Sequence, residues 1–115
     1  MQRNPTLASE IVGLRCANPT YLFIDARLGD AHAFARELVG PFDLVFLDAD
    51  KDGYFAYWTA LRPKLAVSSS FVADNVLRSG SREVTRMMTA VQGDPAFKTH
   101  IEDLGSGEGL LIACR

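Results

Sequence analysis

Three carboxylates and one lysine lie within the stretch LDADKDGY, and their spacing first suggests a calcium loop. Asp48, Asp50, Asp52 and Gly53 match positions 1, 3, 5 and 6 of an EF-hand. That loop also needs a glutamate at position 12, where Thr59 stands, and a helix before it, where the apolar run FDLVFL stands. Because both requirements fail, the carboxylates need another explanation.

Their position relative to two apolar runs offers one. Asp48 directly follows the run Phe42–Leu47, and Asp74 and Asn75 directly follow Phe71–Ala73. Ligands of open α/β sheets bind beyond the carboxyl ends of the strands, so these three side chains converge if the two strands are parallel neighbours. Three oxygen ligands completed by water suit a hard cation such as Mg²⁺. The alternative of an ordinary helix cap and an Asp-Asn turn stays open.

Lys51 follows Asp48 by three residues and can point into the same crevice. A lysine beside a metal has a lowered proton affinity and can serve as a general base. Asp50 is left as a contact to substrate or cofactor, and Asp52 as a solvated residue of the first helical turn. The two histidines, His32 and His100, are expected to be surface or helix residues and not ligands, since neither lies beside this cluster in the sequence.

Strand and helix patterns alternate along the chain and would position these groups. Strands are expected at Tyr21–Ile24 (a run that can extend to Leu28), Phe42–Leu47, Phe71–Ala73, Lys98–Leu104 and Leu110–Cys114. Helices are expected at Ala31–Val39, Tyr54–Leu65 and Ser81–Val91. Such alternation predicts an α/β fold with a mainly parallel sheet and flanking helices. The turn GSGEG should make the final strand pair antiparallel.

Composition narrows the class of protein. The chain has 115 residues, 48% of them hydrophobic, which suits one globular domain. With a net charge of -2 and no basic run, we expect no nucleic-acid partner. No apolar run could span a membrane, and the N-terminus lacks a signal-peptide pattern. Two distant cysteines, Cys16 and Cys114, form neither a disulfide framework nor a zinc site, so we expect a cytoplasmic protein.

Two longer blocks resemble a known family. FDLVFLDADKDGYFAYW and FVADNVLRSG are similar to segments of the cation-dependent class I O-methyltransferases, which include catechol and caffeoyl-coenzyme A O-methyltransferases. RLGDAHAF and GEGLLIACR also resemble family segments, so the resemblance runs from Tyr21 to Arg115. It implies methyl transfer from S-adenosylmethionine, assisted by a divalent cation, to a hydroxyl of a small catechol-like acceptor.

The resemblance also implies roles for individual residues. The expected cation ligands are Asp48, Asp74 and Asn75, and Asp48 is at the same time a cofactor-binding position. Lys51 matches the base that takes the proton from the acceptor hydroxyl. Asp30 and Ala31 match the positions that hold the adenine ring, through a side-chain acceptor and a backbone N–H.

The sequence departs from the family in ways that indicate its C-terminal half. The glycine-rich cofactor loop and the acidic ribose ligand are not found before Tyr21, and Val67-Ser68-Ser69 replaces the usual proline-glycine-glycine turn. The family sheet has the order 3-2-1-4-5-7-6, and the segments present resemble strands 4-5-7-6. Residues 21–115 would form this half-domain, and residues 1–20 have no assigned role.

A half-sheet leaves one strand edge open, and an open apolar edge is a template for pairing. We therefore expect either a homo-oligomer through the edge of the strand near Tyr21 or an N-terminal segment that covers this edge. Two alternatives to an enzyme remain. One is a catalytically silent fragment that acts as an oligomerising or interaction module, and the other is a metal-binding domain without transfer chemistry.

Overall fold

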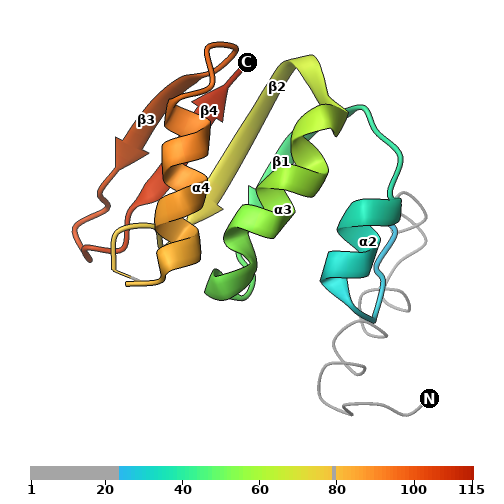
Figure 1. Ribbon diagram of the computed structural model, residues 1–115, viewed down its shortest axis with the longest axis horizontal. Helices are drawn as coiled ribbons and strands as arrows, with labels where there is room; N and C mark the ends of the chain where they lie inside the picture. Colours follow the sequence, from blue (N-terminus) through green and yellow to red (C-terminus); the bar gives the residue numbers. More distant parts are fainter. Residues whose placement is uncertain (1–23, 79) are drawn as a thin grey trace. The chain divides into compact units, whose positions relative to one another are not determined.

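A four-stranded sheet forms the centre of the unit His32–Arg115. The computed structural model describes residues 24–78 and 80–115, and His32–Arg115 form one compact unit. The strands have the spatial order β1-β2-β4-β3, and β4 is antiparallel to both of its neighbours, whereas β1 and β2 are parallel (Figure 1). This confirms the expected α/β half-sheet with an antiparallel last strand. The strands are β1 (Phe42–Leu47), β2 (Leu65–Asp74), β3 (Lys98–Glu102) and β4 (Leu110–Cys114).

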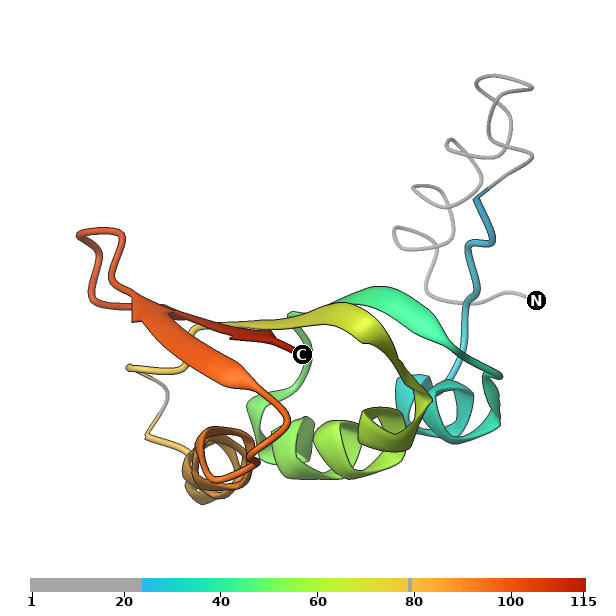
Figure 2. The same ribbon diagram turned by 90° about the horizontal axis from the view of Figure 1, so that it is seen from above.

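Helices α3 (Tyr54–Leu61) and α4 (Arg82–Gln92) cover one face of this sheet (Figure 2). Short 3₁₀ turns, η2 (Lys51–Gly53) and η3 (Arg62–Lys64), flank α3, and α2 (Ala31–Glu37) precedes β1. None of the described helices is long and apolar enough to cross a membrane.

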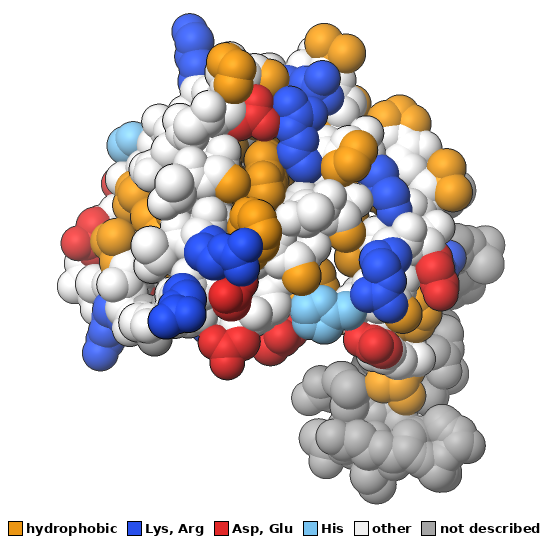
Figure 3. All heavy atoms as spheres, in the orientation of Figure 1, with side chains coloured by type: hydrophobic (Ala, Val, Ile, Leu, Met, Phe, Trp, Pro, Cys, Tyr) orange, Lys and Arg blue, Asp and Glu red, His pale blue; other side chains and the backbone are white. Residues whose placement is uncertain are grey.

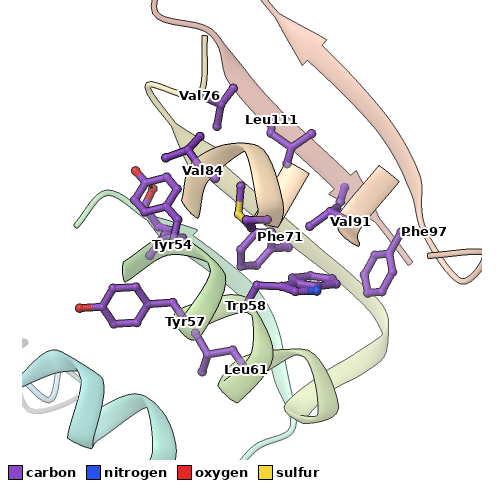
Figure 4. Packing of buried hydrophobic residues seen from close by; sticks show 14 of the residues in the cluster. Tyr54, Tyr57, Trp58, Leu61, Phe71, Val76, Val84, Val91, Phe97 and Leu111 are labelled. Atoms are coloured by element: carbon purple, nitrogen blue, oxygen red, sulfur yellow. Dashed lines mark hydrogen bonds between the residues drawn. The ribbon is translucent and has the colours of Figure 1, made fainter. Parts of the chain in front are cut away.

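The core lies between the sheet and these two helices (Figure 4). Trp58 of α3 packs edge-on against Phe71 of β2 at 4.9 Å and against Phe97 at 5.5 Å between ring centroids. From α4, Val84, Met87 and Val91 are buried, as their helical spacing predicts. These apolar contacts hold α3 in place, and α3 in turn fixes the loop that follows β1.

Several element boundaries differ from the prediction. α3 ends at Leu61 and not at Leu65, β3 ends at Glu102 and not at Leu104, and α4 lies one residue later than the predicted helix. β2 begins at Leu65 and not at Phe71, because η3 already ends the preceding helix and Leu65 pairs with Phe42. The segment Val67–Ser69 is therefore strand and not a turn. The first helix, α2, ends at Glu37, two residues before the predicted Val39.

Of the first predicted strand, Tyr21–Ile24, only Ile24 belongs to the described residues. Tyr21–Phe23 lie outside the described residues, and Ile24–Leu28 form no strand, so the proposed extension to Leu28 is wrong. This short segment lacks the alternating burial of a half-buried strand, since nearly all of its side chains are exposed.

Candidate active site

The carboxyl ends of β1 and β2 lie next to each other. The two strands are parallel, and Leu47 is the register partner of Ala73. Asp48 follows Leu47, and Asp74 follows Ala73. The two aspartates therefore lie at one edge of the sheet, as the sequence predicts. Figure 3 shows acidic side chains gathered along this lower edge of the unit.

Asn75 adopts an unusual backbone conformation, with a φ of 61°. Left-handed backbone is costly for most residues, although asparagine tolerates it better than most. Its N–H donates to Oδ1 of Asp74 at 2.8 Å. An ordinary Asp-Asn turn would make the same contact, so this bond alone does not separate the turn hypothesis from a ligand role. Backbone strain of this kind does recur at functional sites.

Lys51 points toward the same edge and is held by several oxygen atoms. Its Nζ donates to the Tyr54 hydroxyl at 2.7 Å and to the carbonyl of Ala49 at 3.3 Å, and lies 3.5 Å from Oδ1 of Asp48. Burial favours the neutral amine and is the largest single effect, but the contacts with Tyr54 and Asp48 together outweigh it. The pKa of Lys51 is consequently raised above its ordinary value.

Tyr54 is a site residue that the sequence pattern did not reveal, because a tyrosine at the start of an expected helix indicates only packing. Its side chain is fully buried, and its hydroxyl donates to the carbonyl of Asp74 at 2.8 Å, with the carbonyl of Leu47 at 3.4 Å. One phenol thus joins the ends of both strands to Lys51. Burial, together with the nearby charges of Asp48 and Asp74, raises the pKa of Tyr54. A buried tyrosine hydroxyl needs a partner, and this rule could have found it.

Asp50 takes part in a second group of contacts. Tyr57 donates its hydroxyl to Oδ1 of Asp50 at 2.8 Å, and Nε2 of His32 lies 3.2 Å from Oδ2. Burial disfavours the carboxylate, but these two contacts outweigh it and lower the pKa of Asp50. His32 lies on a helix, as expected, but the reason given was wrong, because α2 brings His32 into contact with Asp50. Asp52 is exposed, as expected, and accepts from the hydroxyl of Ser81 at 2.9 Å.

The expected cation ligands supply hard oxygen donors. Among the described residues, no three His, Cys, Asp or Glu side chains are grouped so that they could hold a metal ion. The expected set contains only two carboxylates, from Asp48 and Asp74, and takes its third oxygen from the amide of Asn75. The side chain of Asp48 is 50% exposed and so remains accessible. This donor chemistry fits Mg²⁺, which keeps several waters in protein sites.

The expected adenine pair lies outside the compact unit. Asp30 and Ala31 precede His32, where that unit begins. Asp30 is exposed, and Ala31 is the first residue of α2. Their role in holding adenine stays a prediction. The structure thus brings Asp48, Lys51, Asp74 and Asn75 to one sheet edge. It does not test whether Asp30 and Ala31 bind adenine.

Comparison with known proteins identifies the family to which the chain belongs. Residues 19–98 match the family model described as O-methyltransferase. The chain belongs to this O-methyltransferase family. The match contains the ends of both parallel strands, and with them Asp48, Lys51, Asp74 and Asn75.

Individual relatives agree with this assignment. A catechol O-methyltransferase of Niastella koreensis is 35% identical over 79 residues, which cover 64% of this chain and 36% of the relative. The solved structure of cofactor-bound Rv0187 from MTB is 25% identical with a TM-score of 0.78, and covers 97% of this chain and 57% of its own.

The fold extends to more distant O-methyltransferases. TomG from Streptomyces achromogenes, solved in complex with SAM, is 21% identical with a TM-score of 0.72, and the match covers 97% of this chain and 58% of TomG. The chain therefore spans a little over half the length of these two solved relatives, and its match to the curated relative covers about a third of that protein.

Proposed function

We propose that this chain acts as an O-methyltransferase. It transfers the methyl group of S-adenosylmethionine to a hydroxyl of a small, catechol-like acceptor, and a divalent cation assists the transfer. The observation that carries the proposal is the lysine held beside the carboxylate of Asp48, where two parallel strands end, in a member of this family. Lys51 contacts both Asp48 and the buried hydroxyl of Tyr54. A cytoplasmic location is part of the proposal.

In the proposed site, Lys51 accepts the proton of the acceptor hydroxyl through Nζ. To do so it must first be neutral, and its contact with the carboxylate of Asp48 opposes this. Any ligand that neutralises Asp48 removes that opposition and lowers the pKa of Lys51. Tyr54 keeps the amine at the strand ends throughout, because its hydroxyl is anchored on the carbonyl of Asp74.

The divalent cation would be held by Asp48, Asp74 and Asn75. When bound, it supplies a positive charge that acidifies and orients a coordinated hydroxyl. The protein contributes positioning, since methyl transfer is a direct displacement whose rate depends strongly on alignment. The parallel pairing of β1 and β2 supports this role, because it fixes the spacing of the ligands without requiring a flexible loop.

Calorimetric titration with S-adenosylmethionine, with and without Mg²⁺, tests cofactor binding. Turnover is then followed with catechol as the acceptor. We expect Lys51→Ala to lower turnover by about 100-fold or more while cofactor affinity stays nearly unchanged. Lys98→Ala, at an exposed lysine of β3, is the matched control and should leave both quantities unchanged. A chain that binds no cofactor in either condition would not be an independent enzyme, and a large affinity loss in Lys51→Ala would show that Lys51 is not the base.

Self-association is a second candidate function, and the exposed face of β1 favours it. β1 is the last strand in the sheet order, and Leu44 and Phe46 are 63% and 59% exposed. The predicted homo-oligomer was assigned to a strand edge near Tyr21, which lies outside the described residues. We propose that β1 takes part as well, since it has one neighbour among the described strands and its apolar face is exposed.

Sedimentation velocity measures whether the chain self-associates or stays monomeric. We expect the unmodified chain to sediment as a dimer or larger species and Leu44→Lys to shift it toward monomer. Leu104→Lys, at a residue that is 65% exposed beyond β3, is the control for added charge. A monomeric unmodified chain at high protein concentration would contradict the oligomer.

A further inference from the structure

An aromatic and acidic cluster lies beside the proposed site but outside its cation ligands. The ring of His32 stacks on that of Tyr57, with centroids 4.1 Å apart and planes 13° from parallel. Both rings reach Asp50, through Nε2 of His32 at 3.2 Å and the Tyr57 hydroxyl at 2.8 Å. Because Asp50 is a carboxylate, both ring groups act as donors. We call His32, Tyr57 and Asp50 the Asp50 cluster.

Gly53 leaves the space that this cluster needs. A Cβ atom placed there would lie 2.6 Å from Oδ2 of Asp50 and closer still to the His32 ring. The backbone of Gly53, with φ of -97° and ψ of -3°, is accessible to any residue. The glycine is therefore required for the close approach of the two side chains and not for its conformational freedom.

The geometry points to His32 as a positioning residue that fixes the Asp50 carboxylate as an acceptor for a hydroxyl or amino hydrogen of a bound ligand. Each carboxylate oxygen receives one hydrogen bond within the cluster and keeps a further lone pair. The Asp50 side chain remains 57% exposed, so that acceptor capacity is open to a ligand. Asp50 also lies between Asp48 and Lys51 in the chain, at the edge where the proposed reaction takes place.

The choice of histidine supports positioning over simple packing. Any aromatic ring could stack on Tyr57, but only a ring with an N–H can also hold Oδ2 of Asp50. His32 also directly follows Ala31, one of the two residues expected at the adenine ring. The inference rests on the proposed function, since the ligand that offers the hydrogen is either the cofactor or the hydroxyl acceptor.

The test compares His32→Phe, which keeps the stack and loses the donor, with His100→Phe. His100 makes the same kind of contact, 2.7 Å to Glu102, on the remote strand β3. Affinities for S-adenosylhomocysteine and for catechol are measured by calorimetry in Mg²⁺. We expect His32→Phe to weaken one of them about fivefold or more, and His100→Phe to change neither by more than about twofold. Gly53→Ala should reproduce the loss by displacing His32.

A double-mutant cycle with Asp50→Asn shows whether His32 acts through Asp50. In that background, His32→Phe should cause no further loss of affinity, whereas independent, additive losses would overturn the inference. Weaker S-adenosylhomocysteine binding alone assigns the hydrogen to the cofactor, and weaker catechol binding alone assigns it to the acceptor. Unchanged affinity for both ligands in His32→Phe would also overturn the inference.

Failure of the proposed function is distinguishable from failure of this inference. If the unmodified chain binds neither ligand, the proposed function fails. The same double-mutant cycle is then measured through the free energy of urea unfolding. A coupling of about twofold or more in the unfolding equilibrium constant would support the His32–Asp50 contact, and additivity would overturn it. A merely structural histidine would change unfolding without changing the affinity of the folded protein.

Discussion

Replacing Tyr54 by phenylalanine removes a single oxygen atom from the centre of the site. That oxygen accepts from Lys51 at 2.7 Å and donates to the carbonyl of Asp74 at 2.8 Å. Because the side chain is fully buried, water has no direct route to the vacated position. We therefore expect both a less stable protein and a less well-held lysine.

The magnitude follows from the two bonds. The neutral bond to the Asp74 carbonyl contributes about 1 kcal/mol to the free energy of unfolding. The bond from the charged lysine contributes about 1 kcal/mol more, at the low end for charged donors, because the Lys51 side chain is 25% exposed and water recovers part of the loss. The expected cost of Tyr54→Phe is thus about 2 kcal/mol, a large share of the stability of a small domain.

Urea unfolding followed by tryptophan fluorescence measures this cost, since Trp58 lies on the same helix. Tyr57→Phe is the matched control, because it removes the same atom from the same helix. Its hydroxyl contacts Asp50, which is 57% exposed, so we expect that control to cost less than about 1 kcal/mol. If Tyr54→Phe destabilised the protein no more than Tyr57→Phe does, the linking role of Tyr54 would be refuted.

Two further predictions concern the end of β2 and the end of α4. Asn75→Gly places a glycine, which tolerates left-handed backbone, at the φ of 61°. The free energy of unfolding should therefore stay equal or rise by up to about 1 kcal/mol, whereas the affinity for Mg²⁺ should fall. An unchanged Mg²⁺ affinity, measured by calorimetry, would exclude Asn75 as a ligand. Asp94→Asn removes the negative charge from the 2.7 Å contact with Arg62 and should cost about 2 kcal/mol at neutral pH. Because Arg62 holds the pKa of Asp94 below its usual value of 3.8, this contribution is present above that pH and is lost as the pH falls through the folded pKa. The two unfolding curves should therefore converge in acid, and a gap independent of pH would contradict the ion pair.

The parallel pair at the centre of the site was predictable because its signal is local and strong. Phe42–Leu47 is a nearly unbroken apolar run, and Asp48 follows it directly. The short glycine-rich turn before β4 likewise indicated an antiparallel pair, which the structure confirms. In both places, one stretch of sequence carries the whole signal.

Features that depend on distant partners escaped prediction. The early start of β2 at Leu65 depends on pairing with Phe42, across a register irregularity that no local pattern reveals. The contact of His32 with Asp50 depends on where α2 lies and on the space beside Gly53. Asp30 and Ala31 remain predictions for a similar reason, because a cofactor contact is not a property of one segment.

The buried side chains of α3 belong to the core, and two of them also take part in the candidate site. Side chains of an α-helix tilt toward its N-terminus, so Tyr54 and Tyr57 bury their rings and still extend their hydroxyls toward the turn that begins at Lys51. Tyr54 reaches Lys51, and Tyr57 reaches Asp50. The same packing that fixes α3 against the sheet therefore sets the positions of the proposed base and of its neighbouring carboxylate. A substitution that shifts α3, such as one at Trp58, should disturb the site even though it lies outside the strand-end edge.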